Sequence, residues 1–319
     1  MVFTPNYNSK QLPLHMEQTF RLQSIAEFHQ LCGLPQPEHP LISLIDYSKV
    51  RYPFQESQLS WIQEFYTIGL KRNVTSKFNY GQQVYDFNKG LLSFISPLQF
   101  LKIEIDQNQH TKPSGWLLLI HPDFLWQTPL AKKIKTFDFF GYAINEALFL
   151  SNNEENTIEQ ILLTIEGEYQ SQIDKFSQGL IINQVERLLI YAERFYQRQF
   201  ITRKKSNYQL LEKFESILKR YFDNQSGLIN GVPLVSTIAD ELNISPNYLS
   251  SLLRINTQQN AQQHIQSSMI HYAKARLSTT NSSISEIAFE LGFEHPQSFS
   301  KLFKKKTNQS PSEFKSLFN

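Results

Sequence analysis

The chain has 319 residues, a length typical of about two domains. Hydrophobic residues make up 40% and aromatic residues 13% of it, which is enough to build buried cores and excludes a chain that is disordered throughout. The formal net charge is only +2, so binding to nucleic acid would depend on where the charges lie rather than on their sum.

The sequence also bears on the compartment in which the protein works. It contains no apolar run near the roughly 18 residues of a membrane span, and its first residues, MVFTPNYNSKQ, lack the basic-then-apolar order of a signal peptide. The single cysteine, Cys32, cannot form an internal disulfide, which suits a reducing compartment. We therefore expect a cytoplasmic protein with no membrane partner, in which Cys32 is a partly buried apolar residue rather than a nucleophile or sensor.

The first part of the chain combines a short helix with several strands. The segment QTFRLQSIAEFHQLCGL is a candidate helix, and a proline-rich break then precedes an apolar run of strand length, Leu41 to Ile45. Short runs rich in β-branched and aromatic residues follow up to Trp126, separated by Asn, Gly and Pro. Strands this closely spaced predict an antiparallel sandwich or barrel.

Helical periodicity replaces the strand pattern after about Pro129. One apolar stripe consists of Ile158, Ile161, Leu162, Ile165, Tyr169 and Ile173, and a second of Ile181, Ile182, Val185, Leu188, Leu189, Ala192, Phe195 and Tyr196. The two stripes fit packing within the chain, which we favour, or the surface of a dimer. The basic segment QRQFITRKKSN then predicts a solvated linker, which places a first domain at 1–200 and a second at 207–319.

The second domain contains a repeated pattern of helix, turn and helix. One copy, IADELNISPNYLSSLLR, begins at Ile238, and the same apolar frame recurs about 50 residues later in IAFELGFEHPQSFSKLFK. Gly292 ends the first helix of the second copy, because glycine adopts a left-handed backbone at little conformational cost. A long helix over 260–278 is expected to connect the two copies.

The second helix of each copy has an apolar face and a polar face. In the later copy, Phe299, Leu302 and Phe303 fall on the apolar face, which a short helix needs for packing. The other face carries amides, hydroxyls and amines, which can reach base edges and phosphates in a major groove. A merely solvated basic helix is the alternative for one copy alone, and the repetition favours two helix-turn-helix motifs.

At these residues the chain resembles the AraC/XylS family of bacterial transcription regulators. The resemblance covers about the last hundred residues and is most specific at ISEIAFELGF followed by FSKLFKKKTNQSPSEF. It implies an all-α DNA-binding domain in which the connecting helix holds the two motifs apart. Their recognition helices must then enter successive major-groove turns, roughly 34 Å apart.

Carried over position by position, the resemblance assigns candidate DNA contacts. The base-reading candidates are Asn247, Ser250 and Ser251 in the first recognition helix and Gln297, Ser300 and Lys301 in the second. Arg254, Lys304 and Lys305 are expected to contact phosphates, which position a protein without specifying a sequence. Glutamine can pair with adenine and lysine with guanine, whereas serines predict weaker discrimination. Tyr248 is expected at the border of its helix, where it stacks on a sugar or packs internally.

Two departures from the family pattern concern the ends of the recognition helices. No glycine follows the first helix, at Asn256-Thr257-Gln258. Asn308 stands where glycine is expected after the second, and asparagine tolerates a left-handed backbone.

Family members of this size usually carry an N-terminal sensory or dimerisation domain, often cupin-like. The resemblance thus implies an α+β chain, with a β-rich, cupin-like N-terminal domain and flanking helices before the all-α DNA-binding domain. The expected function is sequence-specific regulation of transcription, modulated through the N-terminal domain. The expected partner is double-stranded DNA at a promoter operator; RNA polymerase, a small-molecule effector and a second copy of the chain are further partner hypotheses.

The N-terminal domain shows no pattern of a catalytic or metal site. A metal-binding cupin needs clustered histidines and a carboxylate, whereas the histidines here are scattered, at His15, His29, His39, His110 and His121. Neither a Gly-rich phosphate loop nor a Gly-x-Ser-x-Gly elbow occurs. We therefore expect no enzyme activity, catalytic residue, metal or cofactor. The aromatic residues from Trp116 to Tyr142 form a core, which we favour, or line a cavity for an unknown ligand.

Two other functions remain as alternatives. In the first, a cupin-like domain catalyses a reaction and the DNA-binding part regulates it. In the second, the chain is a ligand-free architectural or adaptor protein whose affinity for DNA depends little on sequence.

Overall fold

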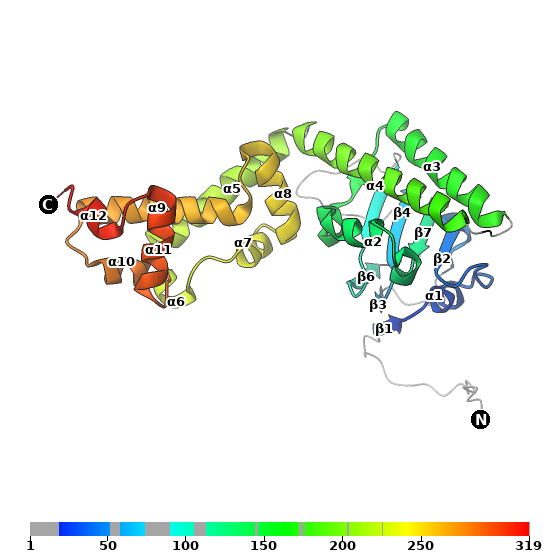
Figure 1. Cartoon of the computed structure of the whole chain (residues 1–319), viewed down its shortest axis with the longest axis horizontal. Coiled ribbons are helices and arrows are strands. Elements are labelled where there is room, and N and C mark those ends of the chain that lie inside the picture. The colour runs from blue at the N-terminus through cyan, green and yellow to red at the C-terminus, as the bar shows by residue number, and fades with distance from the viewer. Residues whose placement is uncertain are drawn as a thin grey trace, which may run out of the picture.

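The computed structural model describes residues 19–51, 58–73, 90–104, 113–143, 146–171, 174, 176–202, 204–224 and 226–318. Within them the chain forms a β-rich N-terminal part and a helical C-terminal part, and it passes from one to the other where α4 (Ser177–Thr202) is followed by α5 (Lys204–Asp223), as Figure 1 shows. The expected α+β fold class, with flanking helices around a β-rich part and an all-α part after it, is confirmed.

Two sheets build the N-terminal part. The larger has the order β2 (Ile42–Asp46), β7 (Ser114–Ile120), β4 (Tyr66–Arg72), β5 (Leu91–Ile95) and β8 (Leu148–Phe149), with every pair antiparallel. The smaller has the order β1 (Thr19–Leu22), β3 (Gln58–Gln63) and β6 (Phe100–Glu104). The predicted antiparallel pairing is confirmed except for β1, which runs parallel to β3. β1 also occupies the start of the segment that we expected to be helical, which leaves α1 (Ile25–Leu31) as a shorter helix.

The central strand β7 is buried on both faces, because successive side chains of a strand point to opposite sides. Leu117 and Leu119 face a cluster shared with β3, β6 and α1, whereas Leu118 and Ile120 face the helices on the other side. Cys32 lies in the first cluster and is fully buried, more deeply than expected. Burial raises the pKa of its thiol to about 12, which disfavours the reactive thiolate.

Helices α3 (Asn152–Gln170) and α4 pack over the outer face of the larger sheet. All eight residues of the second predicted stripe are buried there, so this stripe packs within the chain. Of the first stripe, Tyr169 is half-buried and Ile173 lies outside the described residues. Short helices complete this part: η1 (Tyr47–Lys49), η2 (Pro122–Leu125), α2 (Leu130–Lys133), η3 (Ile134–Thr136) and η4 (Asp138–Gly141). None of the helices in the described ranges is both long and apolar enough to cross a bilayer.

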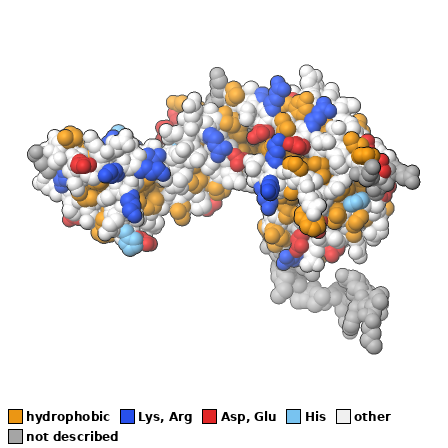
Figure 2. All heavy atoms as spheres, viewed as in Figure 1, with side chains coloured by type: hydrophobic (Ala, Val, Ile, Leu, Met, Phe, Trp, Pro, Cys, Tyr) orange, Lys and Arg blue, Asp and Glu red, His pale blue; other side chains and the backbone are white. Residues whose placement is uncertain are grey.

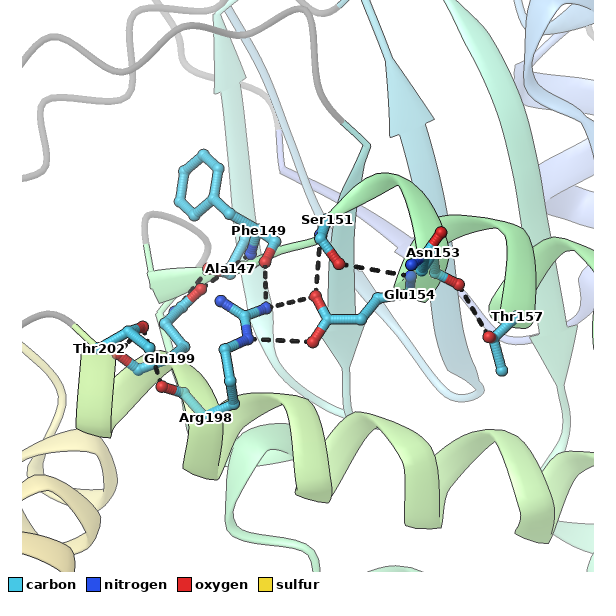
Figure 3. A network of polar contacts seen from close by, with 9 residues as sticks. All are labelled: Ala147, Phe149, Ser151, Asn153, Glu154, Thr157, Arg198, Gln199 and Thr202. Carbon is cyan, nitrogen blue, oxygen red and sulfur yellow. Dashed lines mark hydrogen bonds and ion pairs between the residues drawn. The ribbon is translucent and has the colours of Figure 1, made fainter.

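The segment predicted to be a solvated linker belongs to two helices, α4 and α5. Arg198, expected to be solvated, instead donates to both carboxylate oxygens of Glu154 at 3.0 and 2.6 Å and to the Phe149 carbonyl at 2.9 Å, as Figure 3 shows. Beside it the buried Gln199 accepts from the Phe149 N–H at 2.9 Å. These bonds tie the end of α4 to β8 and to the first turn of α3. Arg203 lies outside the described residues.

The C-terminal part contains two similar helix-turn-helix units on one long helix. Its helices after α5 are α6 (Gly227–Asn230), α7 (Val235–Glu241), α8 (Pro246–Thr257), α9 (Ala261–Thr279), α10 (Ile284–Glu290), α11 (Pro296–Thr307) and α12 (Pro311–Lys315). Units α7–α8 and α10–α11 share a core with α9, and that core includes Leu249, Ile265 and Phe299. A capping box between Asn260 and Gln263 starts α9 at the expected place.

The two units repeat the same backbone geometry at their turns. Gly292 and its equivalent Asn243 both have positive φ, +87° and +56°. At the ends of the recognition helices, Gln258 and Asn308 are both left-handed, each with a φ of 62°. Each also donates its N–H to a carbonyl of the preceding turn at 2.8 Å. The left-handed conformation expected at Asn308 is confirmed, and Gln258 adopts it although glutamine is poorly suited to it.

Replacing Gln258 by glycine should therefore stabilise the protein. Gln258→Gly is expected to raise the free energy of unfolding by about 0.5–1 kcal/mol, since relief of the left-handed strain exceeds the extra chain entropy of glycine. Urea denaturation of the full chain measures this change. Gln259→Gly is the matched control, because Gln259 is not left-handed and glycine there should only destabilise. Equal effects of the two changes would contradict the prediction.

Candidate nucleic-acid interface

The second recognition helix, α11, presents a polar stripe to solvent. It begins with Pro296, whose fixed φ suits the first turn, and Phe299 and Phe303 anchor its other face in the core. Gln297, Lys301, Lys304 and Lys305 are all exposed. Their spacing of three and four residues places them on neighbouring turns of one side of the helix. Figure 2 shows Lys and Arg side chains spread over one face of this lobe.

Ser300 is the exception within this stripe. It is half-buried, and its hydroxyl donates to the Pro296 carbonyl of its own helix at 3.0 Å. The hydroxyl oxygen can still accept a hydrogen bond, but its proton is already engaged. Ser300 thus offers less to a base edge than Gln297 or Lys301.

The second helix-turn-helix unit, α10–α11, is fixed to the connecting helix α9. Arg276 of α9 donates to both carboxylate oxygens of Glu290 in α10, at 2.9 and 2.7 Å. This bidentate pair raises the pKa of Arg276, and its planar geometry fixes α10 against α9. The Lys315 amine also donates to the Ser282 carbonyl at 2.7 Å, which ties α12 to the start of α10. The second unit is therefore held on several sides.

The first recognition helix, α8, packs against two cores. Ser245 caps its N-terminus by accepting from the Tyr248 N–H at 3.1 Å. Leu249 faces the helical core. Tyr248 and Leu252 instead belong to the core of the N-terminal part. Of the two roles weighed for Tyr248, the structure shows internal packing, since only 1% of the residue is exposed.

The DNA-contact candidates of α8 are less exposed to solvent than those of α11. Asn247 and Arg254 are exposed and Ser250 is half-buried, but Ser251 is only 5% exposed. Ser251 donates to the Asp138 carboxylate at 3.0 Å, and the Arg254 guanidinium pairs with the same carboxylate at 3.1 Å. In this structure Ser251 is not turned outward as base reading requires. Base reading by Ser251 and phosphate contact by Arg254 remain predictions.

The N-terminal residues that meet α8 were not predicted from the sequence. Glu146 is fully buried, and its carboxylate accepts from the Ser245 N–H at 2.6 Å, the Ser245 hydroxyl at 2.5 Å and the Ala143 N–H at 2.6 Å. Burial raises the pKa of Glu146, and these hydrogen bonds oppose the shift because they favour the charged form. Tyr142 packs edge-on against Tyr248, with ring centroids 5.3 Å apart. No sequence signal marks these residues, since an acid beside an aromatic run usually lies at the surface.

The N-terminal part shows structural roles for its described histidines. His29 lies near Ser43, with 2.9 Å between its Nε2 and the serine hydroxyl, and burial lowers its pKa. His39 accepts from the Leu41 N–H at 3.1 Å in a loop. His15 and His110 lie outside the described residues. Among those described, no three His, Cys, Asp or Glu side chains gather as metal ligands would.

The predicted aromatic core is present, with one exception. Phe139 and Tyr142 are buried, and Phe139 stacks on Tyr196 with centroids 5.5 Å apart. Trp126, which we grouped with them, is 73% exposed. Burial also raises the pKa of the Tyr142 phenol, an effect that a hydrogen bond with Ser251 partly offsets.

Comparison with known proteins adds to this geometry. A family model described as a helix-turn-helix domain matches residues 238–316, from within α7 to just beyond α12. The chain is 30% identical over 146 residues to the uncharacterized HTH-type transcriptional regulator YfiF of Bacillus subtilis, covering 46% of this chain and 43% of that protein. It is 28% identical over 81 residues to the regulatory protein SoxS of Salmonella typhimurium, covering 25% of this chain and 76% of SoxS. The chain thus spans less than half of YfiF.

Among solved structures, ToxT from Vibrio cholerae aligns over 88% of this chain and 99% of its own, with 14% sequence identity and a TM-score of 0.30.

Proposed function

We propose that this chain, whose C-terminal part is a helix-turn-helix domain of the AraC type, regulates transcription by binding specific DNA sequences. The observation that carries the proposal is the exposed polar stripe of α11, repeated by sequence in α8. In the proposed complex, α8 and α11 enter successive major grooves on one face of a duplex, as two recognition helices held on one connecting helix can do.

The proposal divides the chain at the places predicted from the sequence. Residues 207–319 would bind DNA, and residues 1–200 would sense a signal or dimerise. The separate core around Phe214 and Ile265, formed by helices of the C-terminal part, supports this division. A small-molecule effector could act only by binding two states of the chain with different affinity. RNA polymerase and a second copy of the chain are further proposed partners, and the bacterial cytoplasm is the proposed location.

An enzyme activity of the N-terminal part is not favoured. Its described histidines have structural partners, and the described residues bring no set of metal ligands together. Metal analysis of the purified protein would separate the two functions, because a metal-dependent enzyme should retain its ion.

Selection from random DNA tests the proposal directly. The full chain would be incubated with duplexes of random sequence, and the bound fraction sequenced. We expect two enriched half-sites separated by about one helical turn, roughly 10 base pairs. Uniform recovery of all sequences would instead favour an architectural protein, and no recovery would contradict DNA binding.

The base-reading assignment predicts position-specific effects. Gln297→Ala or Lys301→Ala should relax the preference at particular base pairs of one half-site, with a loss of about 1–3 kcal/mol per contact. The selection repeated with each variant measures this. Gln309→Ala, which makes the same chemical change beyond the end of α11, should leave every preference intact. A loss that is equal for all sequences would remove Gln297 and Lys301 from the base-reading set.

The phosphate assignment predicts a salt effect instead. Lys304→Ala or Lys305→Ala should weaken binding to all duplexes alike and lower the slope of log affinity against log salt by about one per contact. Lys135→Ala, which removes an equal charge from the N-terminal part, is the control and should leave the slope unchanged. A slope that stays the same in the α11 variants would exclude these lysines from the interface.

A further inference from the structure

The side of α8 proposed to face DNA is covered in this structure. Asp138 binds Ser251 and Arg254, and Gly141 lies against Asn247. These three α8 residues are spaced as neighbours on one side of the helix. We call this packing, between Asp138, Gly141, Tyr142 and Glu146 of the N-terminal part and helix α8, the α8 contact. Figure 1 shows α8 between the two parts, next to α4.

Two carboxylates in the α8 contact take positions suited to phosphate. Glu146 accepts from the Ser245 N–H and hydroxyl at the N-terminus of α8, where free N–H groups and the helix dipole favour an anion. Asp138 pairs with Arg254, which the family resemblance assigns to a phosphate. Hydroxyls, backbone amides and arginines are the groups that commonly bind DNA phosphates. The N-terminal part thus presents to α8 the kind of acceptors that a DNA backbone would present.

The segment that carries Glu146 is held in place from behind by α4. The Tyr196 hydroxyl donates to the Glu146 carbonyl at 3.2 Å, and the Gln199 amide donates to the Ala147 carbonyl at 3.4 Å. Gln199 belongs to the network of Figure 3, which joins α4 to β8 and α3. Glu146 is therefore fixed to the β-rich part rather than carried by a free loop.

A duplex and η4 cannot occupy this side of α8 together. A Cβ atom built on Gly141 would lie 2.0 Å from the Asn247 amide nitrogen, so the two segments are in direct contact. A major groove about 12 Å wide accommodates one α-helix. It has no room for α8 with η4 still attached.

We propose that the α8 contact is an intramolecular substitute for DNA that keeps the first recognition helix from entering a groove. This inference rests on the proposed function. In the closed state only α11 can engage a duplex, and α8 must separate from Asp138 and Glu146 before both helices bind. The apparent affinity of the chain for a two-site duplex is then reduced by the fraction of molecules that are closed.

A disulfide across the α8 contact tests this proposal. The Cβ position of Gly141 lies 3.7 Å from that of Asn247, within the roughly 3.5–4.5 Å that a disulfide spans. The double variant Gly141→Cys, Asn247→Cys would be made in the full chain. Its reduced form would be used to select a duplex from the random pool. Buried Cys32 should not interfere, because its thiolate is disfavoured. Non-reducing mass spectrometry verifies the bond.

The oxidised form should bind the selected duplex at least about tenfold more weakly than the reduced form, since the disulfide holds every molecule in the closed state. Its footprint should cover only the half-site of α11, and reduction should restore both. Each single cysteine variant should respond to neither oxidant nor reductant. Equal affinity and an equal two-site footprint in both forms would overturn this inference but leave the proposed function standing. If neither form distinguished any sequence, the proposed function and the inference would both fall.

A release variant tests the opposite direction without a disulfide. Asp138→Ala removes one hydrogen bond and one half-exposed ion pair from the closed state, so the full chain should bind the selected duplex about three- to tenfold more tightly. Asp123→Ala removes an equal negative charge from an exposed site away from α8 and controls for the general change in charge. An equal gain in both variants, or none in either, would contradict a closing role for Asp138.

Discussion

The packing of α8 against two cores is the constraint on which the arrangement of the chain depends. A helix this short needs only one apolar stripe to fold, and the stripe through Leu249 and Leu253 already meets the helical core. The second stripe, with Tyr248 and Leu252, buries further apolar surface against the N-terminal part. That burial offsets the cost of enclosing the Glu146 carboxylate, which is stabilised by three donors. The contact therefore combines apolar packing with polar partners that solvent or a nucleic acid could replace.

Much of this fold follows from periodicity in the sequence. The buried stripe of α4 was predicted residue by residue, because a 3.6-residue repeat determines which side of a helix meets the core. The paired units of the C-terminal part were predicted because their apolar frame is duplicated. The left-handed turns at Gly292 and Asn308 followed from the few residues that tolerate that backbone. The AraC-type resemblance rests on the same residues, and a helix-turn-helix family model matches them.

Other features depend on partners far away in the chain, which local patterns cannot identify. Arg198 seemed solvated in a basic segment, yet its ion pair is with Glu154. Asp138 and Glu146 gave no signal, since their partners Ser251 and Ser245 lie 113 and 99 residues away in sequence. The apolar face of α8 was clear, but its spacing could not show that Tyr248 and Leu252 meet a different core from Leu249. For the same reason the exposure of Ser251 was misjudged.

The unequal mounting of the two recognition helices has a kinetic consequence. The polar stripe of α11 is exposed, and its unit is fixed to α9 through the pair between Arg276 and Glu290 of α10, so α11 can meet a duplex while α8 is still in contact with the N-terminal part. Once α11 holds DNA, the neighbouring groove competes for α8 at an effective concentration set by the length of α9, in the millimolar range for short tethers. At that effective concentration the groove can displace the α8 contact, if the contact is of modest strength. The protein would thus search along DNA with α11 alone bound. At a sequence that suits α11, α8 would bind as well.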